Sequence, residues 1–164
     1  MRHVISILME NEAGALSRVA GLFSARGYNI ESLTVAPTDD DTLSRLTLVT
    51  VGSDEIVEQI IKQLHKLIDV VKVMDLNDYP HIEREMMLVK IDMQKHGACD
   101  VVKRISDIFR ARIIDVGEKS YTVEVTGSRG KLDGFLQALH ELRVVEVVRS
   151  GSMGIARGAV ALNV

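Results

Sequence analysis

A short turn near the start of the chain carries the residue types that a small charged ligand needs. The turn is Asn11-Glu12-Ala13-Gly14, and an apolar helical period begins directly after it. A helix N-terminus offers unpaired amide groups and the positive end of the helix dipole, which suit a carboxylate. Gly14 has no Cβ, so a ligand can approach its backbone closely, and the Asn11 amide could bond an ammonium group. A tight turn that only caps the helix explains the same residues, and spacing alone favours that simpler interpretation.

A second asparagine, Asn29, follows the other end of the same predicted helix. It lies about 20 Å from Asn11, because an α-helix rises about 1.5 Å per residue. The two side chains could therefore line one pocket only if a second copy of the chain supplied one of them. If the turn binds a ligand, the spacing predicts a pocket at the interface of a homodimer.

Residues that could support catalysis or metal binding do not converge. None of the five histidines lies at metal-ligand spacing from another histidine, a cysteine or an acid in a recognised pattern. His65 and His140 occupy equivalent places near predicted helix ends, where an imidazole can interact with the dipole. Cys99 has no nucleophile context and is interpreted as a small hydrophobic residue; an enzyme that uses Cys99 or His65 is a remote alternative. The three aspartates at 39–41 are more typical of a solvated loop tip than of a cation site, so we predict no catalytic residues and no metal site.

Phosphate-binding motifs are also missing from the pattern. There is no P-loop and no dinucleotide fingerprint, and the segment Gly151-Ser152-Met153-Gly154 opens no recognisable helix. Phe23, Phe109 and Phe135 all fall on predicted helices, whereas RNA-binding sheets carry aromatic residues on their central strands. RNA binding is therefore disfavoured.

The composition indicates a soluble protein of the reducing cytoplasm. The chain has 164 residues and a net charge of -3, which argues against a nucleic-acid binder. Its single cysteine cannot form an internal disulfide, which suits the cytosol. No segment approaches the roughly 18 apolar residues of a membrane span, and the apolar run at the N-terminus is too short for a signal sequence. We expect a cytoplasmic protein that binds neither membranes nor nucleic acids.

The first 76 residues predict six elements, recognised by apolar periods of 2 or 3.6 and by the turn residues between them. The elements are a strand at 3–9, a helix at 14–26, strands at 30–36 and 43–51, a helix at 55–66 and a strand at 70–76. Their order is β-α-β-β-α-β.

The same unit recurs after a linker. Val51-Gly52-Ser53 returns as Thr126-Gly127-Ser128, and Gln63–Leu67 returns as Ala138–Leu142. The second half predicts strands at 86–93, 113–116, 121–125 and 144–148 and helices at 101–109 and 131–142, with no element assigned to 151–164. This order is the ferredoxin-like arrangement of the α+β class. We therefore predict two tandem ferredoxin-like domains, at 1–76 and at 82–164 with the tail, joined by a linker at 77–81.

The first strand predicts that both faces of its sheet are covered. Ile5 and Ile7 alternate with Val4 and Leu8, so each face carries apolar residues. Two helices on one face of a four-stranded sheet leave the other face open, and exposed apolar sheet is a liability. We expect either a cover on the second face or a sheet that continues into a partner chain. The second domain of the same chain is the simpler cover.

Motifs throughout the chain resemble the small regulatory subunit of acetolactate synthase, also called acetohydroxyacid synthase. The resemblance covers nearly the whole chain and is least characteristic in the tail. The segments that carry it are Glu10–Arg18, Gly21–Phe23, Arg26–Val35, Leu43–Arg45, Gln63–Leu67, Arg84–Lys90, Ile113–Val116 and Lys131–Asp133.

The resemblance implies a regulatory role in branched-chain amino acid biosynthesis. It implies that the first domain is an ACT domain, and that paired ACT domains bind valine at their interface. The chain would activate a separate catalytic subunit that uses thiamine diphosphate, Mg2+ and FAD, with no cofactor of its own, and bound valine would withdraw that activation. The residues that it assigns to the effector site are Asn11, Gly14, Ala15, Ser17, Asn29, Ile30, Thr34, Ala36 and Gln59. Packing explains four of them, Ser17, Thr34, Ala36 and Gln59, as well as ligand binding does.

The alternative from another class is a free-standing amino-acid-responsive regulator of transcription or of another enzyme. Regulators of transcription of this kind usually carry a helix-turn-helix domain as well. We expect two ferredoxin-like units to take up the 164 residues, which disfavours this alternative.

Overall fold

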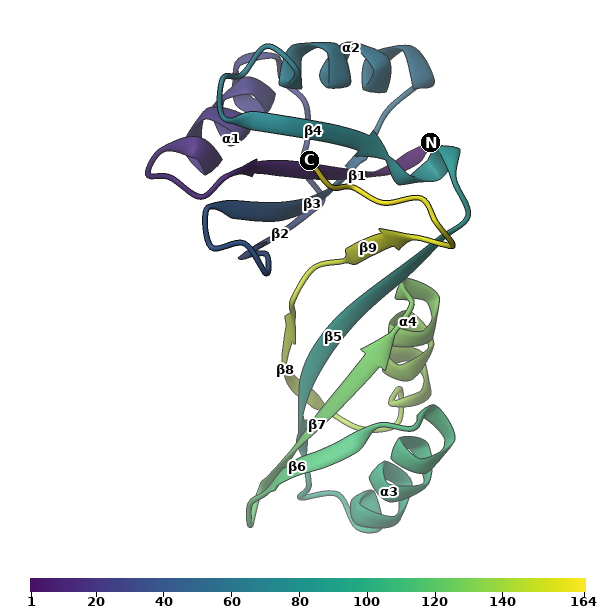
Figure 1. The fold of residues 1–164 in the computed structure, drawn as a ribbon. Helices are drawn as coiled ribbons and strands as arrows, with labels where there is room; N and C mark the ends of the chain where they lie inside the picture. The colour runs from purple at the N-terminus through teal and green to yellow at the C-terminus, as the bar shows by residue number, and fades with distance from the viewer. The chain divides into compact units, whose positions relative to one another are not determined.

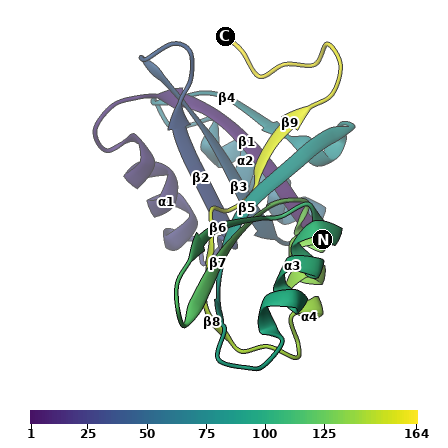
Figure 2. The same cartoon turned by 90° about the horizontal axis from the view of Figure 1, so that it is seen from below.

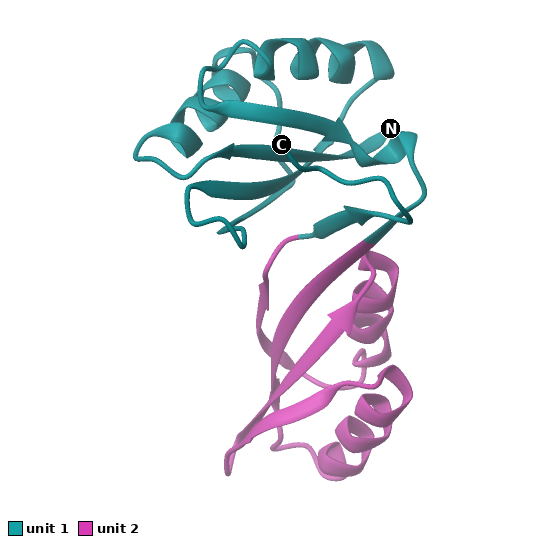
Figure 3. Ribbon diagram, viewed as in Figure 1, with its two compact units in different colours: residues 1–82, 152–164 teal, residues 83–151 magenta.

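The computed structural model describes residues 1–164, which form two compact units. The first unit contains residues 1–82 together with 152–164, and the second contains residues 83–151 (Figure 3). Both follow the order β-α-β-β-α-β, so the predicted α+β fold of two ferredoxin-like units is confirmed. The tail departs from the predicted division, because residues 152–164 pack with the first unit and not with the second.

The first unit is a four-stranded antiparallel sheet with two helices on one face (Figures 1 and 2). Its strand order is β2-β3-β1-β4. The elements are β1 (Arg2–Glu10), α1 (Ala15–Ala25), β2 (Ser32–Pro37), β3 (Leu43–Val51), α2 (Asp54–Leu64) and β4 (Val70–Asp75). The core lies between sheet and helices, where Ile5 and Ile7 of β1 pack with Phe23 of α1 and Ile60 of α2.

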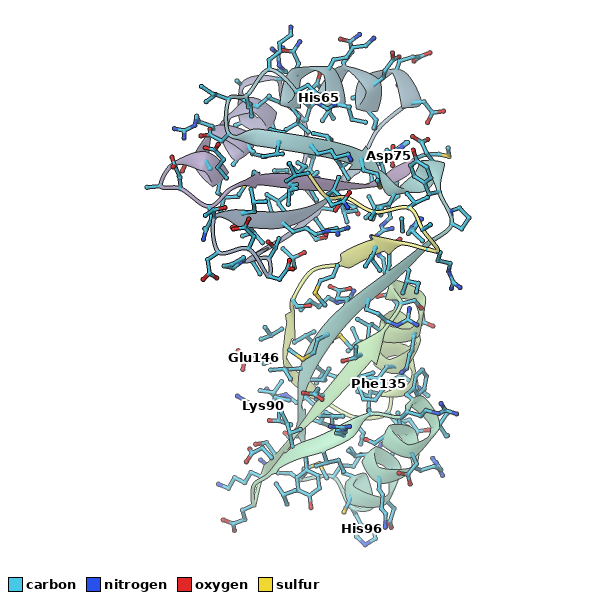
Figure 4. The ribbon with its side chains drawn as sticks, in the orientation of Figure 1. His65, Asp75, Lys90, His96, Phe135 and Glu146 are labelled. Atoms are coloured by element: carbon cyan, nitrogen blue, oxygen red, sulfur yellow. The ribbon has the colours of Figure 1, made fainter.

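The second unit repeats this plan with the strand order β6-β7-β5-β8. Its elements are β5 (His81–Asp92), α3 (Ala98–Phe109), β6 (Arg112–Val116), β7 (Ser120–Gly127), α4 (Arg129–Ala138) and β8 (Val144–Arg149). Phe135 is fully buried between α4 and the sheet and meets Phe109 edge to face, with ring centroids 5.5 Å apart. On the sheet, Lys90 of β5 and Glu146 of β8 form an ion pair of 3.0 Å (Figure 4).

The repeated sequence motifs mark the same helix caps in both units. Ser53 and Ser128 occupy the same place in the two copies of the repeated motif. Each caps a helix, because its side chain accepts a hydrogen bond from the backbone amide three residues later in the chain. Gly14 and Gly97 both precede the first helix of their unit with a positive φ, of 90° and 77°. The repeat in the sequence is therefore a repeat of local backbone geometry.

The residues predicted as a linker are partly structured. Leu76 opens a 3-10 turn, η1 (Leu76–Asp78), and is fully buried against Val4 and Val49. The Asp75 side chain accepts a hydrogen bond from the Asn77 amide and lies 2.8 Å from Nδ1 of His3 (Figure 4). β5 then begins at His81, so the first strand of the second repeat starts five residues before the predicted residue 86.

The C-terminal tail covers the second face of the first sheet. Its strand β9 (Met153–Ala156) contacts β1 and η1 on the side away from α1 and α2 (Figure 1). Val4 and Leu8 of β1 are buried there, as the alternating pattern predicts. An ideal Cβ on Gly154 would lie 2.4 Å from Cδ1 of Leu76 and 3.3 Å from Cγ1 of Val4. Only a glycine lets the tail approach the sheet this closely.

None of the helices combines the length and hydrophobicity that a bilayer crossing requires.

We expect Gly154→Ala to destabilise the first unit by about 1–3 kcal/mol, because the added methyl group overpacks a site next to the fully buried Leu76. Thermal and urea unfolding measure this change. Gly21→Ala is the matched control, since no atom lies within 4 Å of its new methyl group, and alanine is favoured over glycine in a helix by roughly 1 kcal/mol. Equal stabilities of Gly154→Ala and the unmodified chain would contradict the close approach.

Candidate functional site

The turn between β1 and α1 leaves the helix N-terminus without a side-chain cap. Gly14 occupies the N-cap position with φ 90° and has no side chain to accept a hydrogen bond from the first-turn amides. Residues with a Cβ rarely adopt this backbone conformation, which explains why the sequence places glycine here. No side chain of the N-cap residue therefore bonds the first-turn amides of α1, the groups that the sequence analysis considers for a carboxylate.

Arg18 places a positive charge beside the same turn. Its guanidinium donates two hydrogen bonds to the buried carboxylate of Asp69, in the loop before β4; the Nη2–Oδ1 distance is 2.8 Å. An ideal Cβ on Gly14 would lie 3.0 Å from Nη1 of Arg18. Hydrogen bonding to Arg18 lowers the pKa of Asp69, and the same bond raises that of Arg18. Sequence analysis missed this pair, because 51 residues separate its members and no pattern links them.

Asn11 joins the turn to the loop between β2 and β3. Its side-chain amide donates to the carbonyl oxygen of Asp41 at 2.9 Å, and its oxygen accepts from the Ser44 hydroxyl at 3.1 Å. A carboxamide has two N–H donors and two acceptor lone pairs. One N–H donor and one lone pair of Asn11 are therefore left for a ligand. In that loop, the backbone amide and the hydroxyl of Thr42 donate to the Asp40 carboxylate, and these hydrogen bonds lower its pKa.

Asn29 and Ile30 lie at the opposite end of the first unit. The Thr50 hydroxyl donates to the Asn29 carbonyl oxygen at 2.7 Å, whereas Asn11 is bonded to Thr42, at the other end of β3. The eight residues of extended chain between Thr42 and Thr50 put these ends roughly 26 Å apart, at about 3.3 Å per residue. The Asn29 side chain is exposed, and Ile30 packs against the core. One chain therefore does not bring Asn11 and Asn29 together.

The other predicted effector residues fall in three different places. Ala15 is buried in the core beneath α1, so packing accounts for its size. Ser17 on α1 and Gln59 on α2 are exposed. Thr34 and Ala36 lie on β2 and line a cavity of about 550 Å3 between the sheet and the tail. The Thr34 hydroxyl donates to the Ser152 carbonyl oxygen at 2.8 Å.

Groups that could perform catalysis do not meet in the structure. Cys99 Sγ lies 3.7 Å from the hydroxyl of Tyr121 and has no histidine partner. His65 lies at the C-terminal end of α2, near the place predicted for it (Figure 4). No group of three or more His, Cys, Asp or Glu side chains is arranged to hold a metal ion.

Both halves of the chain match models of one protein family. Residues 5–72 match the AHAS small subunit-like ACT domain, and residues 84–158 match the small subunit of acetolactate synthase. The acetolactate synthase isozyme 3 small subunit of Escherichia coli (strain K12) is 58% identical over 159 residues, covering 96% of this chain and 97% of the relative. The acetolactate synthase small subunit of Haemophilus influenzae is 54% identical with the same coverage.

A solved structure agrees with these matches. The crystal structure of the acetolactate synthase small subunit from Thermotoga maritima superposes with a TM-score of 0.87 at 37% identity, covering 98% of this chain and 99% of that one. The first half is thus an ACT domain, followed by a second ferredoxin-like unit. The chain belongs to the acetolactate synthase small-subunit family, which confirms the resemblance seen in the sequence.

The Arg18–Asp69 pair predicts a pH dependence of stability. Because the pKa of Asp69 is lowered from its ordinary value of 3.8, the stabilisation is complete above that value and is lost as the pH falls through the lowered pKa. We expect Arg18→Gln to destabilise the chain at neutral pH and the difference to shrink as the pH falls from about 5 to 2.5. Urea unfolding across this range measures it.

Lys62→Gln is the control, because it breaks an exposed ion pair with Glu58 on α2, worth less than about 0.5 kcal/mol. A stability difference for Arg18→Gln that stays constant from pH 7 to the acid limit would contradict the role given to Asp69.

Proposed function

We propose that this chain is the regulatory subunit of an acetolactate synthase, which activates a separate catalytic subunit and makes it sensitive to inhibition by valine. The identity of 58% to the Escherichia coli isozyme 3 small subunit, over nearly the full length of both chains, carries this proposal. The cofactors implied by the resemblance, thiamine diphosphate, Mg2+ and FAD, belong in the proposal to the catalytic partner in the cytoplasm.

The effector site that we propose lies at the β1–α1 turn of a homodimer. The uncapped amides at the start of α1 would bind the valine carboxylate. The free lone pair of the Asn11 amide would accept from the valine ammonium group. Asn29 and Ile30 would come from the second chain, because within one chain they lie at the far end of the sheet.

The remaining predicted residues have weaker support at this turn. Ser17, in the first turn of α1, stays in the proposed set because it is exposed close to the amides. Ala15 would act through packing, since it is buried. Thr34, Ala36 and Gln59 would influence valine inhibition from a distance, because none of them lies on the β1–α1 turn.

A ligand between two chains can change how they pair. Inhibition then requires that the valine-bound dimer differ from the free dimer in its affinity for, or action on, the catalytic subunit. Small amino acids of micromolar to millimolar affinity supply about 4–8 kcal/mol of binding free energy, which exceeds the typical coupling of about 1–3 kcal/mol.

A reconstituted assay tests the function and the site together. The purified chain should form no acetolactate alone, should raise the rate of the catalytic subunit, and should lose this effect when valine is added. Gly14→Asp should keep the activation but raise the valine concentration for half-inhibition at least tenfold, because the new carboxylate occupies the anion position beside Arg18 and the helix amides.

Gly97→Asp is the matched control for this variant. Gly97 has the same N-cap position and a similar φ in the second unit, so its substitution adds the same strain away from the proposed site. Acetolactate formation by the chain alone would exclude the function, and full valine sensitivity of Gly14→Asp would exclude the site.

The two-chain pocket makes a stoichiometric prediction. Asn11→Ala and Asn29→Ala homodimers should each lose valine binding, since both pockets lack one asparagine. A heterodimer of the two variants has one pocket with both substitutions and one with neither, so it should bind one valine per dimer with unchanged affinity. Calorimetry on differently tagged chains measures this. A heterodimer that binds no valine, or a chain that is monomeric in solution, would argue against the shared pocket.

A further inference from the structure

The second face of the first sheet holds a cavity that the proposed valine site does not use. It measures about 550 Å3 and lies between β2, β3 and the C-terminal tail, away from the β1–α1 turn. Asn11 and Gly14 do not line it. Residues of β2, β3 and the tail line it, with Arg45 as the basic residue among them.

Arg45 is the one basic residue in this lining, and it lacks an acidic partner. Its Nε donates to the Ser6 hydroxyl at 3.0 Å, and its Nη2 donates to the Gly154 carbonyl oxygen at 3.1 Å. A guanidinium has five N–H donors, so these bonds leave three. Asp39 lines the same cavity but forms no ion pair with Arg45. Arg45 is therefore a partly buried cation with free donors next to an open space.

The surroundings of Arg45 disfavour its charge. Burial lowers the pKa of its guanidinium, and no carboxylate offsets this effect. Partly buried charges are normally paired, because the loss of hydration is costly. In contrast, the more exposed Arg18 has a carboxylate partner in Asp69. The position of Arg45 is that of a cation whose anion comes from outside the chain.

The rest of the lining is mainly apolar. Val35, Ala36 and Pro37 of β2 and Met153, Ile155 and Leu162 of the tail are among the lining residues. Its volume falls within the range of roughly 300–1,000 Å3 that small-molecule sites occupy. We propose that this cavity binds a small aliphatic carboxylate, with Arg45 holding the carboxylate group and the tail covering the hydrocarbon part.

This site is independent of the proposed valine site. It would give Thr34 and Ala36, which the sequence resemblance assigns to the effector set, a direct contact with a different ligand. It also gives the tail a function, because the Gly154 carbonyl oxygen holds Arg45 and the tail closes one wall. A bound carboxylate would stabilise the docked tail.

Titration calorimetry with 3-methylbutanoate as the probe tests the proposal on the full-length chain. We expect saturable binding by about 10 mM probe, and at least tenfold weaker binding of 3-methylbutanamide, which has the same shape and no charge. Arg45→Gln should weaken binding of the acid at least tenfold, and Arg45→Lys should weaken it less. Arg26→Gln, which removes an exposed arginine bonded to Gln63, is the matched control and should bind normally.

A second variant covers the case in which Arg45→Gln does not fold. Ile155 is 55% exposed and lines the cavity, so Ile155→Trp should fill the space without disturbing the core and should abolish binding. Equal binding of acid and amide, or normal binding by Ile155→Trp, would overturn the proposal. Loss of probe binding in Gly14→Asp would also overturn it, by placing the acid at the β1–α1 turn, whereas the proposed valine site would stand.

Discussion

The central strand β1 is buried on both faces, and each face needs its own cover. Ile5 and Ile7 lie under the two helices, while Val4 and Leu8 face the other way. Burial stabilises a protein by roughly 25 cal/mol per Å2 of apolar surface, so leaving one face in water would forgo much of what a small domain can gain. The tail supplies the second cover, and its close approach depends on the missing side chain of Gly154.

This second cover brings polar groups of the sheet together with the backbone of the tail. Thr34 and Arg45 donate to tail carbonyl oxygens, and the Lys72 ammonium donates to the carbonyl oxygen of Asn163 at 3.1 Å. A tail with one short strand leaves carbonyl groups unpaired, and these side chains satisfy three of them. The same arrangement leaves the cavity around Arg45, so the way in which the sheet is covered also creates the space for a ligand.

In the proposed function, the two ends of α1 let one small unit act as half of a sensor. Its N-terminus has amides without a side-chain cap beside the Arg18–Asp69 pair, whereas Asn29 follows its C-terminus. A ligand that needs both ends must bridge two chains, which links ligand binding to quaternary structure. The second unit repeats the Gly N-cap at Gly97, so this backbone motif is common to both units.

The sequence by itself determined the order of the elements, their repeat and the identity of the turn, because period, glycine position and capping serine are local signals. It predicted β3 at its observed bounds and most helix ends within a few residues. Only the tertiary structure decided where the tail lies, which acid pairs with Arg18 and that Arg45 has no acid. These are contacts between segments as much as 150 residues apart, and they follow from the three-dimensional packing of faces that no local pattern encodes.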